Sequence, residues 1–187
     1  PILNPSDVQD YVDLGLHGWA LSRYSGCWVG FKCVTDTVDS GASVLVGSDR
    51  VRIVAPGFEF PAGDHHIGAR KTLLEIERQL FRVKLPAAQA YARANGLDRV
   101  VLDSPRRRLG IVTTGKAYLD VRQALQELGI DERRAAELGI SLYKVALSWP
   151  LEPEGALAFC RGLENVLVIE EKRPLLEEQL ARILYNE

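Results

Sequence analysis

The chain has 187 residues, of which 47% are hydrophobic and 26% are charged, a composition typical of soluble globular proteins. Its net charge of -2 gives no basic field that attracts nucleic acid or an anionic membrane, so we expect neither as a partner. The sequence has no apolar run of the ~18 residues that span a bilayer and no basic-then-apolar leader, so we expect a cytoplasmic location.

The three cysteines, Cys27, Cys33 and Cys160, are odd in number and form no C-x-x-C spacing. They indicate neither a disulfide framework nor a zinc or iron–sulfur site, so we expect no cofactor and no metal in this chain itself. The sequence contains no methionine, and we therefore expect a piece of a longer polypeptide that begins within a domain.

Residues 1–46 are predicted to form a partial α/β segment. Asn4 as N-cap and Pro5 at the first helical position predict a helix that runs to about Arg23. Alternating side chains over residues 27–34 predict a strand.

Residues 47–84 are predicted to be a linker with a short strand and a helix. The stretch 47–68 is rich in Gly, Ser and Pro and is interrupted only by a strand-like run at 51–54. A helix follows, marked by Leu73 and Ile76 at helical spacing, and a second one is predicted over 86–96. A long weakly structured segment is unusual inside a compact domain, so we place a domain boundary here.

Residues 85–187 are predicted to form an α/β domain with a mostly parallel sheet flanked by helices. Strands and helices alternate along this part, which implies helices on both faces of the sheet. The predicted strands are 99–103, 109–113, 141–147 and 165–170, and the later predicted helices are 116–128, 131–138, 153–163 and 174–185. Ligands of such sheets bind beyond the carboxyl ends of the strands. Those ends carry Thr113-Thr114, Ser148-Trp149-Pro150 and Glu170-Glu171-Lys172.

Residues 110–117 follow the phosphate-loop pattern G-x-x-x-x-G-K-[ST] until the last position, which is Ala117. Ala117 has no oxygen for Mg²⁺, and Ile111 and Val112 belong to a buried strand, so the sequence argues against a nucleotide loop. A strand, a Thr-Thr-Gly turn and a helix N-terminus remain, which can bind an anion or serve as ordinary scaffold.

The candidate anion-binding residues come from that turn and from a basic loop just before the strand. Three neighbouring guanidinium groups can clamp a phosphate or a carboxylate, although a solvated loop is the alternative. The candidates are Thr113, Thr114, Gly115, Arg106, Arg107 and Arg108.

Three other features suggest chemistry less strongly. Residues 64–66, Asp-His-His, are adjacent in a linker, which favours a solvated loop over a metal site. His17 has no nucleophile motif beside it, which favours a packing histidine over a general base. Glu170 and Glu171 stand next to Lys172, so we expect them to stay ionised, with a structural role at the strand edge or a subunit contact.

Four segments of the chain resemble the fused indolepyruvate ferredoxin oxidoreductases. They are residues 11–32 (YVDLGLHGWALSRYSGCWVGFK), 36–40 (DTVDS), 115–125 (GKAYLDVRQAL) and 168–173 (VIEEKR). The resemblance runs nearly end to end and identifies the chain as an internal fragment of such an enzyme.

The resemblance implies what the full-length enzyme does. The family carries out thiamine diphosphate-dependent oxidative decarboxylation of aryl 2-oxoacids to acyl-CoA and passes electrons through iron–sulfur clusters to ferredoxin. Thiamine diphosphate, Mg²⁺ and the clusters are thus implied for the full-length protein, with ferredoxin and CoA as its partners.

The resemblance also assigns the parts of this chain. Residues 1–46 correspond to the tail of a pyrimidine-binding domain and residues 85–187 to a transketolase C-terminal-like domain, which in the family builds dimer contacts and in some relatives helps receive coenzyme A. None of the family's catalytic motifs lies in this sequence, so no catalytic residue is carried over. We expect a packing role with the remaining domains of the same polypeptide, in a homo-oligomer; the alternative is an anion- or CoA-binding α/β module.

Overall fold

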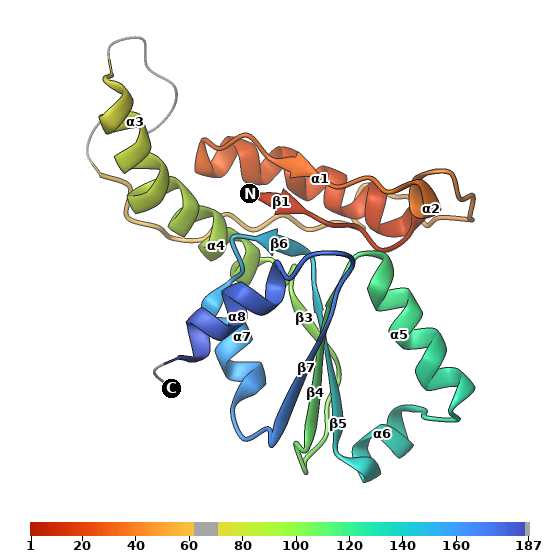
Figure 1. The fold of residues 1–187 in the computed structure, drawn as a ribbon. Coiled ribbons are helices and arrows are strands. Elements are labelled where there is room, and N and C mark those ends of the chain that lie inside the picture. The colour runs from red at the N-terminus through yellow and green to blue at the C-terminus, as the bar shows by residue number, and fades with distance from the viewer. Residues whose placement is uncertain (62–70, 186–187) are drawn as a thin grey trace.

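The computed structural model describes residues 1–61 and 71–185, and a four-stranded sheet lies at its centre (Figure 1). Its strands are β3 (Arg99–Leu102), β4 (Leu109–Thr114), β5 (Ile140–Val145) and β7 (Asn165–Ile169), in the spatial order β3-β5-β4-β7. β4 pairs in parallel with β5 and with β7, whereas β3 runs antiparallel to β5. The predicted mostly parallel sheet is confirmed.

Helices cover both faces of this sheet, as the alternation of elements predicts. One face carries α5 (Lys116–Glu127) and α6 (Glu132–Leu138), and the other carries α7 (Pro153–Cys160) and α8 (Leu176–Leu184) (Figure 1). Successive strand residues point to opposite faces. Ile111 therefore packs in the cluster with α5 and α6, and its neighbour Val112 packs in the cluster with α7 and α8.

The N-terminal part shares a second sheet with the C-terminal part. Its elements are β1 (Ile2–Leu3), α1 (Val8–Ser25), β2 (Gly30–Phe31), α2 (Thr35–Val38) and β6 (Leu147–Trp149). β1 lies between β2, to which it is parallel, and β6, to which it is antiparallel. A buried cluster that includes Leu3, Leu21 and Leu147 fills the space below α1.

Two predictions for this part are wrong in detail. Asn4 does not cap the first helix, because its side chain bonds to Thr114; Asp7 is the N-cap and accepts from the Asp10 N–H. The predicted strand over 27–34 shrinks to β2, because its partner β1 has only two residues.

The two helices predicted on either side of residue 85 are one continuous helical segment. α3 (Leu73–Gln79) passes into the π-helical turn η1 (Leu80–Lys84) and then into α4 (Leu85–Ala94). Proline usually breaks a helix because it lacks an N–H and crowds the preceding turn. Here the wider π-helical turn, in which the Leu85 N–H donates to Leu80 O, stands directly before Pro86 and accommodates it. The domain boundary placed between residues 84 and 85 falls inside this segment.

Residues 41–61, here called the strap, contain no helix or strand, so the strand-like run at 51–54 does not form one. Side chains of α1 and of Asn95, the residue that follows α4, nevertheless hold the strap at several points. Gln9 exchanges two hydrogen bonds with the Leu45 backbone, Arg50 pairs with Asp13, Asn95 exchanges two with Val54, and the Tyr24 hydroxyl donates to Pro56 O.

Candidate functional site

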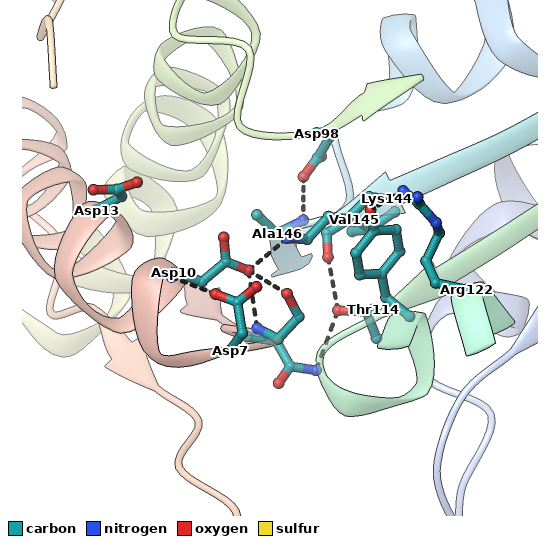
Figure 2. Close-up of polar contacts among 12 residues, drawn as sticks. Asp7, Asp10, Asp13, Asp98, Thr114, Arg122, Lys144, Val145 and Ala146 are labelled. Carbon is teal, nitrogen blue, oxygen red and sulfur yellow. Dashed lines mark hydrogen bonds and ion pairs between the residues drawn. The ribbon is translucent and has the colours of Figure 1, made fainter. Parts of the chain in front are cut away.

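The carboxyl ends of β4 and β5 are where a ligand of this fold is expected, and the N-terminal segment covers them. Thr114 ends β4 and lies opposite Val145, the last residue of β5. The Thr114 hydroxyl donates to Val145 O at 2.8 Å and accepts from Asn4 Nδ2 at 3.1 Å (Figure 2). Both hydrogen-bonding roles of this hydroxyl are therefore filled within the chain.

Gly115 lies directly under Asn4. Its φ of +55° is a conformation that favours glycine, and a Cβ there would lie 2.5 Å from Asn4 Oδ1. Thr113, beside it, is fully buried, and its Oγ1 has no hydrogen-bond partner among the described residues. The three turn residues of the predicted anion site are consecutive and lie together. The Asn4 side chain packs against Gly115 and bonds to Thr114, so it occupies the space in which an anion would contact these two residues.

The three arginines of the predicted site lie at the other end of β4 and are not brought to the turn. Arg106 donates to Glu137 O near the end of α6, and Arg107 donates to Phe159 O and Arg161 O at the end of α7. Their positive charges stand where the carbonyl groups of these two helices end, which is favourable for the helix dipoles. Arg108 forms an ion pair with Glu164. The prediction of one shared site for both groups is therefore wrong, because β4 separates them.

The acidic pair that follows β7 has the structural role predicted for it. The Glu170 carboxylate accepts from the N–H groups of Leu175, Leu176 and Glu177 and so caps the start of α8. Glu171 lies 4.0 Å from the Lys32 ammonium group.

A cavity of about 520 Å³, here called the edge cavity, opens beside these residues. Residues from all three predicted strand ends line it, among them Thr114, Ser148 and Lys172. Its charged lining residues are Lys32, Lys116, Lys172, Arg173, Glu170 and Glu171. The Glu170 carboxylate caps α8, and Lys116 pairs with Asp120. The charged residues that line the edge cavity still include more cations than anions, which favours an anionic ligand.

A buried ion pair joins α1 to the central sheet. Lys144, near the end of β5, contacts Asp10 at 2.5 Å and lies 4.6 Å over the Tyr118 ring (Figure 2). Burial alone raises the pKa of Asp10, but the charge of Lys144 and hydrogen bonds from Lys144 and Ser6 outweigh it and hold this pKa below its ordinary value. No local pattern signals this pair, since 134 residues separate its members.

A second carboxyl group, that of Asp98, has the opposite shift. Its Oδ1 accepts from the N–H groups of Ala146 and Leu147 at 2.7 and 2.9 Å, whereas its Oδ2 is buried without a partner in the described structure. Burial raises the pKa of Asp98 to about 7 despite the two hydrogen bonds, and the charge of Glu152 adds to the effect. Glu152 itself caps α7 and pairs with Arg93.

The other candidates that the structure describes form no catalytic or metal-binding arrangement. His17 Nδ1 lies 3.0 Å from the Tyr91 hydroxyl, and burial lowers its pKa although Asp13 acts in the other direction. The three cysteines are free, and the described residues contain no group of three or more His, Cys, Asp or Glu side chains able to hold a metal. They therefore do not fit an iron–sulfur cluster. Residues 64–66 lie outside the described residues.

Among the helices of the described part, none combines the length and apolar character needed to cross a bilayer.

Comparisons with known proteins relate the chain to one group of enzymes. Residues 99–187 match the family described as the indolepyruvate oxidoreductase domain. The chain is 27% identical to "Indolepyruvate oxidoreductase subunit IorA" of Methanothermobacter thermautotrophicus and 28% identical to that of Methanothermobacter marburgensis. These alignments cover 98% and 100% of this chain, but 28% and 29% of the relatives, so the chain spans under a third of their length.

A solved structure confirms the fold. The 2-oxoglutarate:ferredoxin oxidoreductase from Magnetococcus marinus, solved with 2-oxoglutarate, coenzyme A and succinyl-CoA bound, superposes with a TM-score of 0.59. The superposition covers 100% of this chain and 37% of that one, at 15% identity.

Proposed function

We infer that the chain, whose residues 99–187 match the indolepyruvate oxidoreductase domain, is a segment of a 2-oxoacid:ferredoxin oxidoreductase, and we propose that this segment packs and assembles the enzyme. The observation that carries the inference is similarity over nearly the whole chain to under a third of each relative. The proposed activity of the whole protein is oxidative decarboxylation of aryl 2-oxoacids to acyl-CoA with electron transfer to ferredoxin. Thiamine diphosphate, Mg²⁺ and iron–sulfur clusters are proposed to be held by its other parts.

The use of the polar groups supports a packing role. The side chains at the carboxyl edge of the central sheet bond to one another: Asn4 to Thr114, and Asp10 to Lys144. These bonds join the N-terminal segment to the sheet and leave few groups at that edge for chemistry. The described chain thus resembles a scaffold whose catalytic partners lie elsewhere.

An exposed apolar face supports the proposed partner, the remaining domains of the same polypeptide. A groove of about 680 Å³ runs between α1 and the segment leading into β2, and none of the described residues that line it is charged. Trp19 and Trp28 border this groove and are 77% and 86% exposed, unusual values for such large apolar side chains. Gly15 lies in the middle of α1, and a Cβ there would meet nothing within 4 Å, so packing within the described part of the chain does not require glycine. A glycine costs a helix about 1 kcal/mol relative to alanine, and close approach by another domain accounts for it.

The helix α3 carries a second exposed apolar surface. It projects from the body of the molecule (Figure 1), and its Leu73 and Leu74 are 86% and 74% exposed. We propose that the remaining domains, or a second copy in a homo-oligomer, cover this helix.

The activity is tested with the protein encoded by the whole gene and with the 187-residue chain alone. Both are assayed with indolepyruvate, thiamine diphosphate, Mg²⁺, CoA and ferredoxin. We expect acyl-CoA from the whole protein and none from the chain. Acyl-CoA formation by the chain alone contradicts the packing role, and a whole protein that oxidises no 2-oxoacid contradicts the proposed enzyme.

The partner face is tested in the whole protein with Trp19→Ser and Trp28→Ser combined. We expect the variant to lose assembly. Light scattering is expected to show a smaller particle mass, and the groove is expected to lose its protection from proteolysis. Tyr185→Ser is the matched control, since it also removes a highly exposed aromatic ring. Unchanged assembly in the double variant contradicts the assignment of the groove.

A second candidate function, binding of an anionic ligand such as coenzyme A, is supported by the cation excess of the edge cavity. Thr114 is the predicted anion-binding residue that lines this cavity, next to Lys172 and Arg173 from another loop. Calorimetry with coenzyme A tests it: Lys172→Ala with Arg173→Ala is expected to abolish the heat of binding. Replacing Arg106, Arg107 and Arg108 is expected to leave it unchanged, because these residues lie at the other end of β4. Equal heats for wild type and the Lys172/Arg173 variant contradict this function.

A further inference from the structure

A polar cavity of about 400 Å³ lies beneath the strap, and it is here called the strap cavity. Its walls come from α1, the strap, the turn between α4 and β3, the starts of β3 and α5, and the end of β5. The volume is in the range of small-molecule sites. This cavity is separate from the edge cavity and from the apolar groove, and the proposed packing role does not use it.

The acidic residues of the strap cavity are already committed within the chain. Asp7 caps α1, and Asp10 is paired with Lys144. Asp13 accepts two hydrogen bonds from Arg50, from Nε at 3.0 Å and from Nη2 at 2.7 Å. Their negative charges are therefore balanced or used before any ligand arrives.

Two cations of the same cavity remain without a counterpart. Arg52 comes from the strap and Arg99 from the start of β3, and both line the cavity. Within the described part of the chain the side chain of neither residue makes a hydrogen bond or an ion pair, in contrast to that of Arg50, two residues before Arg52. His17, whose Nδ1 lies 3.0 Å from the Tyr91 hydroxyl, also lines the cavity.

We propose that the strap cavity binds a small molecule through an oxyanion group, a carboxylate or a phosphate, held between Arg52 and Arg99. A guanidinium group offers a planar fork of N–H donors that matches two oxygens of such a group. Arg52 belongs to the strap and Arg99 to the central sheet, so an anion between them ties the strap to the sheet.

The test uses the 187-residue chain with two probes, inorganic phosphate and malonate, followed by calorimetry and by NMR of the arginine Nε–H groups. We expect saturable binding that shifts the Arg52 and Arg99 signals and protects the strap from proteolysis. The probe that binds more tightly distinguishes a phosphate from a carboxylate ligand. Absence of binding by both probes overturns the proposal.

Three variants separate a built site from general attraction of anions. Arg52→Ala with Arg99→Ala is expected to weaken binding at least about tenfold, because both forks are removed. Arg52→Lys with Arg99→Lys keeps the charge but lacks the fork, and is expected to weaken binding too. Arg78→Ala with Arg82→Ala removes the same charge from α3 and η1, at positions that line neither the strap cavity nor the edge cavity, and is expected to leave these signals and the affinity unchanged. Equal binding by the lysine variant, or equal weakening by the Arg78/Arg82 variant, overturns the proposal.

Discussion

Asn4 donates a 3.1 Å hydrogen bond to Thr114 across 110 residues of sequence, and its amide lies over Gly115 at the start of α5. The Asn4 N–H also donates to Ala146 O, directly after β5. One residue of the N-terminal segment thus contacts the carboxyl ends of both central strands. These bonds explain why the turn that was predicted as an anion site is covered by the chain's own N-terminal segment.

Replacement of Asn4 by alanine is expected to lower the free energy of unfolding by about 1–2 kcal/mol, because a buried hydrogen bond is lost and a small void forms. Urea denaturation followed by circular dichroism measures the change. Asn165→Ala, at an exposed position, is the control and is expected to change little. Equal stabilities for the two variants contradict the role of Asn4.

Replacement of Gly115 by alanine is expected to destabilise the chain by about 3 kcal/mol or more, since the methyl group overlaps the Asn4 amide and φ is positive. Gly129→Ala is the matched control: its φ is +68°, but nothing lies within 4 Å of its Cβ. It is expected to cost only about 1–2 kcal/mol of backbone strain. Adding Asn4→Ala to Gly115→Ala is expected to recover part of the loss, and thermal unfolding of all four proteins shows whether it does.

Replacement of Lys144 by methionine is expected to cost about 3–5 kcal/mol, because the Asp10 carboxylate is left buried without its partner. The double variant Asp10→Leu with Lys144→Met is expected to be more stable than the single variant. A double-mutant cycle in urea measures the coupling, and additive effects contradict it.

The same pair predicts loss of stability in acid. The pKa of Asp10 is depressed in the folded chain, so its contribution is present above the ordinary value near 3.8 and is lost as pH falls through the folded pKa. Stability measured below pH 4 is expected to fall less steeply in the Asp10→Leu, Lys144→Met variant than in the wild type.

Asp98 predicts the opposite dependence at higher pH. Its folded pKa of about 7 exceeds the ordinary value of 3.8, so the folded chain is favoured at low pH and loses stability as pH rises toward and through 7. Asp98→Asn keeps an oxygen to accept from Ala146 and Leu147 and cannot ionise. It is expected to match the wild type near pH 4 and to exceed it at pH 8 by about 2–4 kcal/mol. Parallel stability curves for the two proteins contradict the prediction.

The regular α/β part could be predicted because its signals are local. Gly115 before α5, Gly129 after it and Asp131 at the start of α6 each mark an element boundary through their own conformational preferences. The antiparallel direction of β3 could not be predicted in this way, because it depends on pairing with β5, some forty residues further along the chain.

The candidate site was predicted only in part, because sequence proximity was a poor guide to proximity in space. Arg107 and Thr113 are six residues apart, but an extended strand of that length spans roughly 20 Å. The groups that do meet, Asp10 with Lys144 and Asn4 with Thr114, are more than a hundred residues apart in sequence. Their pairing follows from how α1 and the N-terminal segment dock on the sheet, which no local pattern encodes.

The helical segment from α3 through α4 has a practical consequence for dividing the protein. A recombinant piece that starts at residue 85 begins in the middle of a hydrogen-bonded helix and leaves behind the carbonyl groups that its first N–H groups bind. It also loses Leu3 and Leu21, against which Tyr91 packs. Such a truncation exposes apolar surface that is buried in the whole chain, so the C-terminal module is expected to aggregate when it is expressed without the N-terminal segment that carries Leu3 and Leu21.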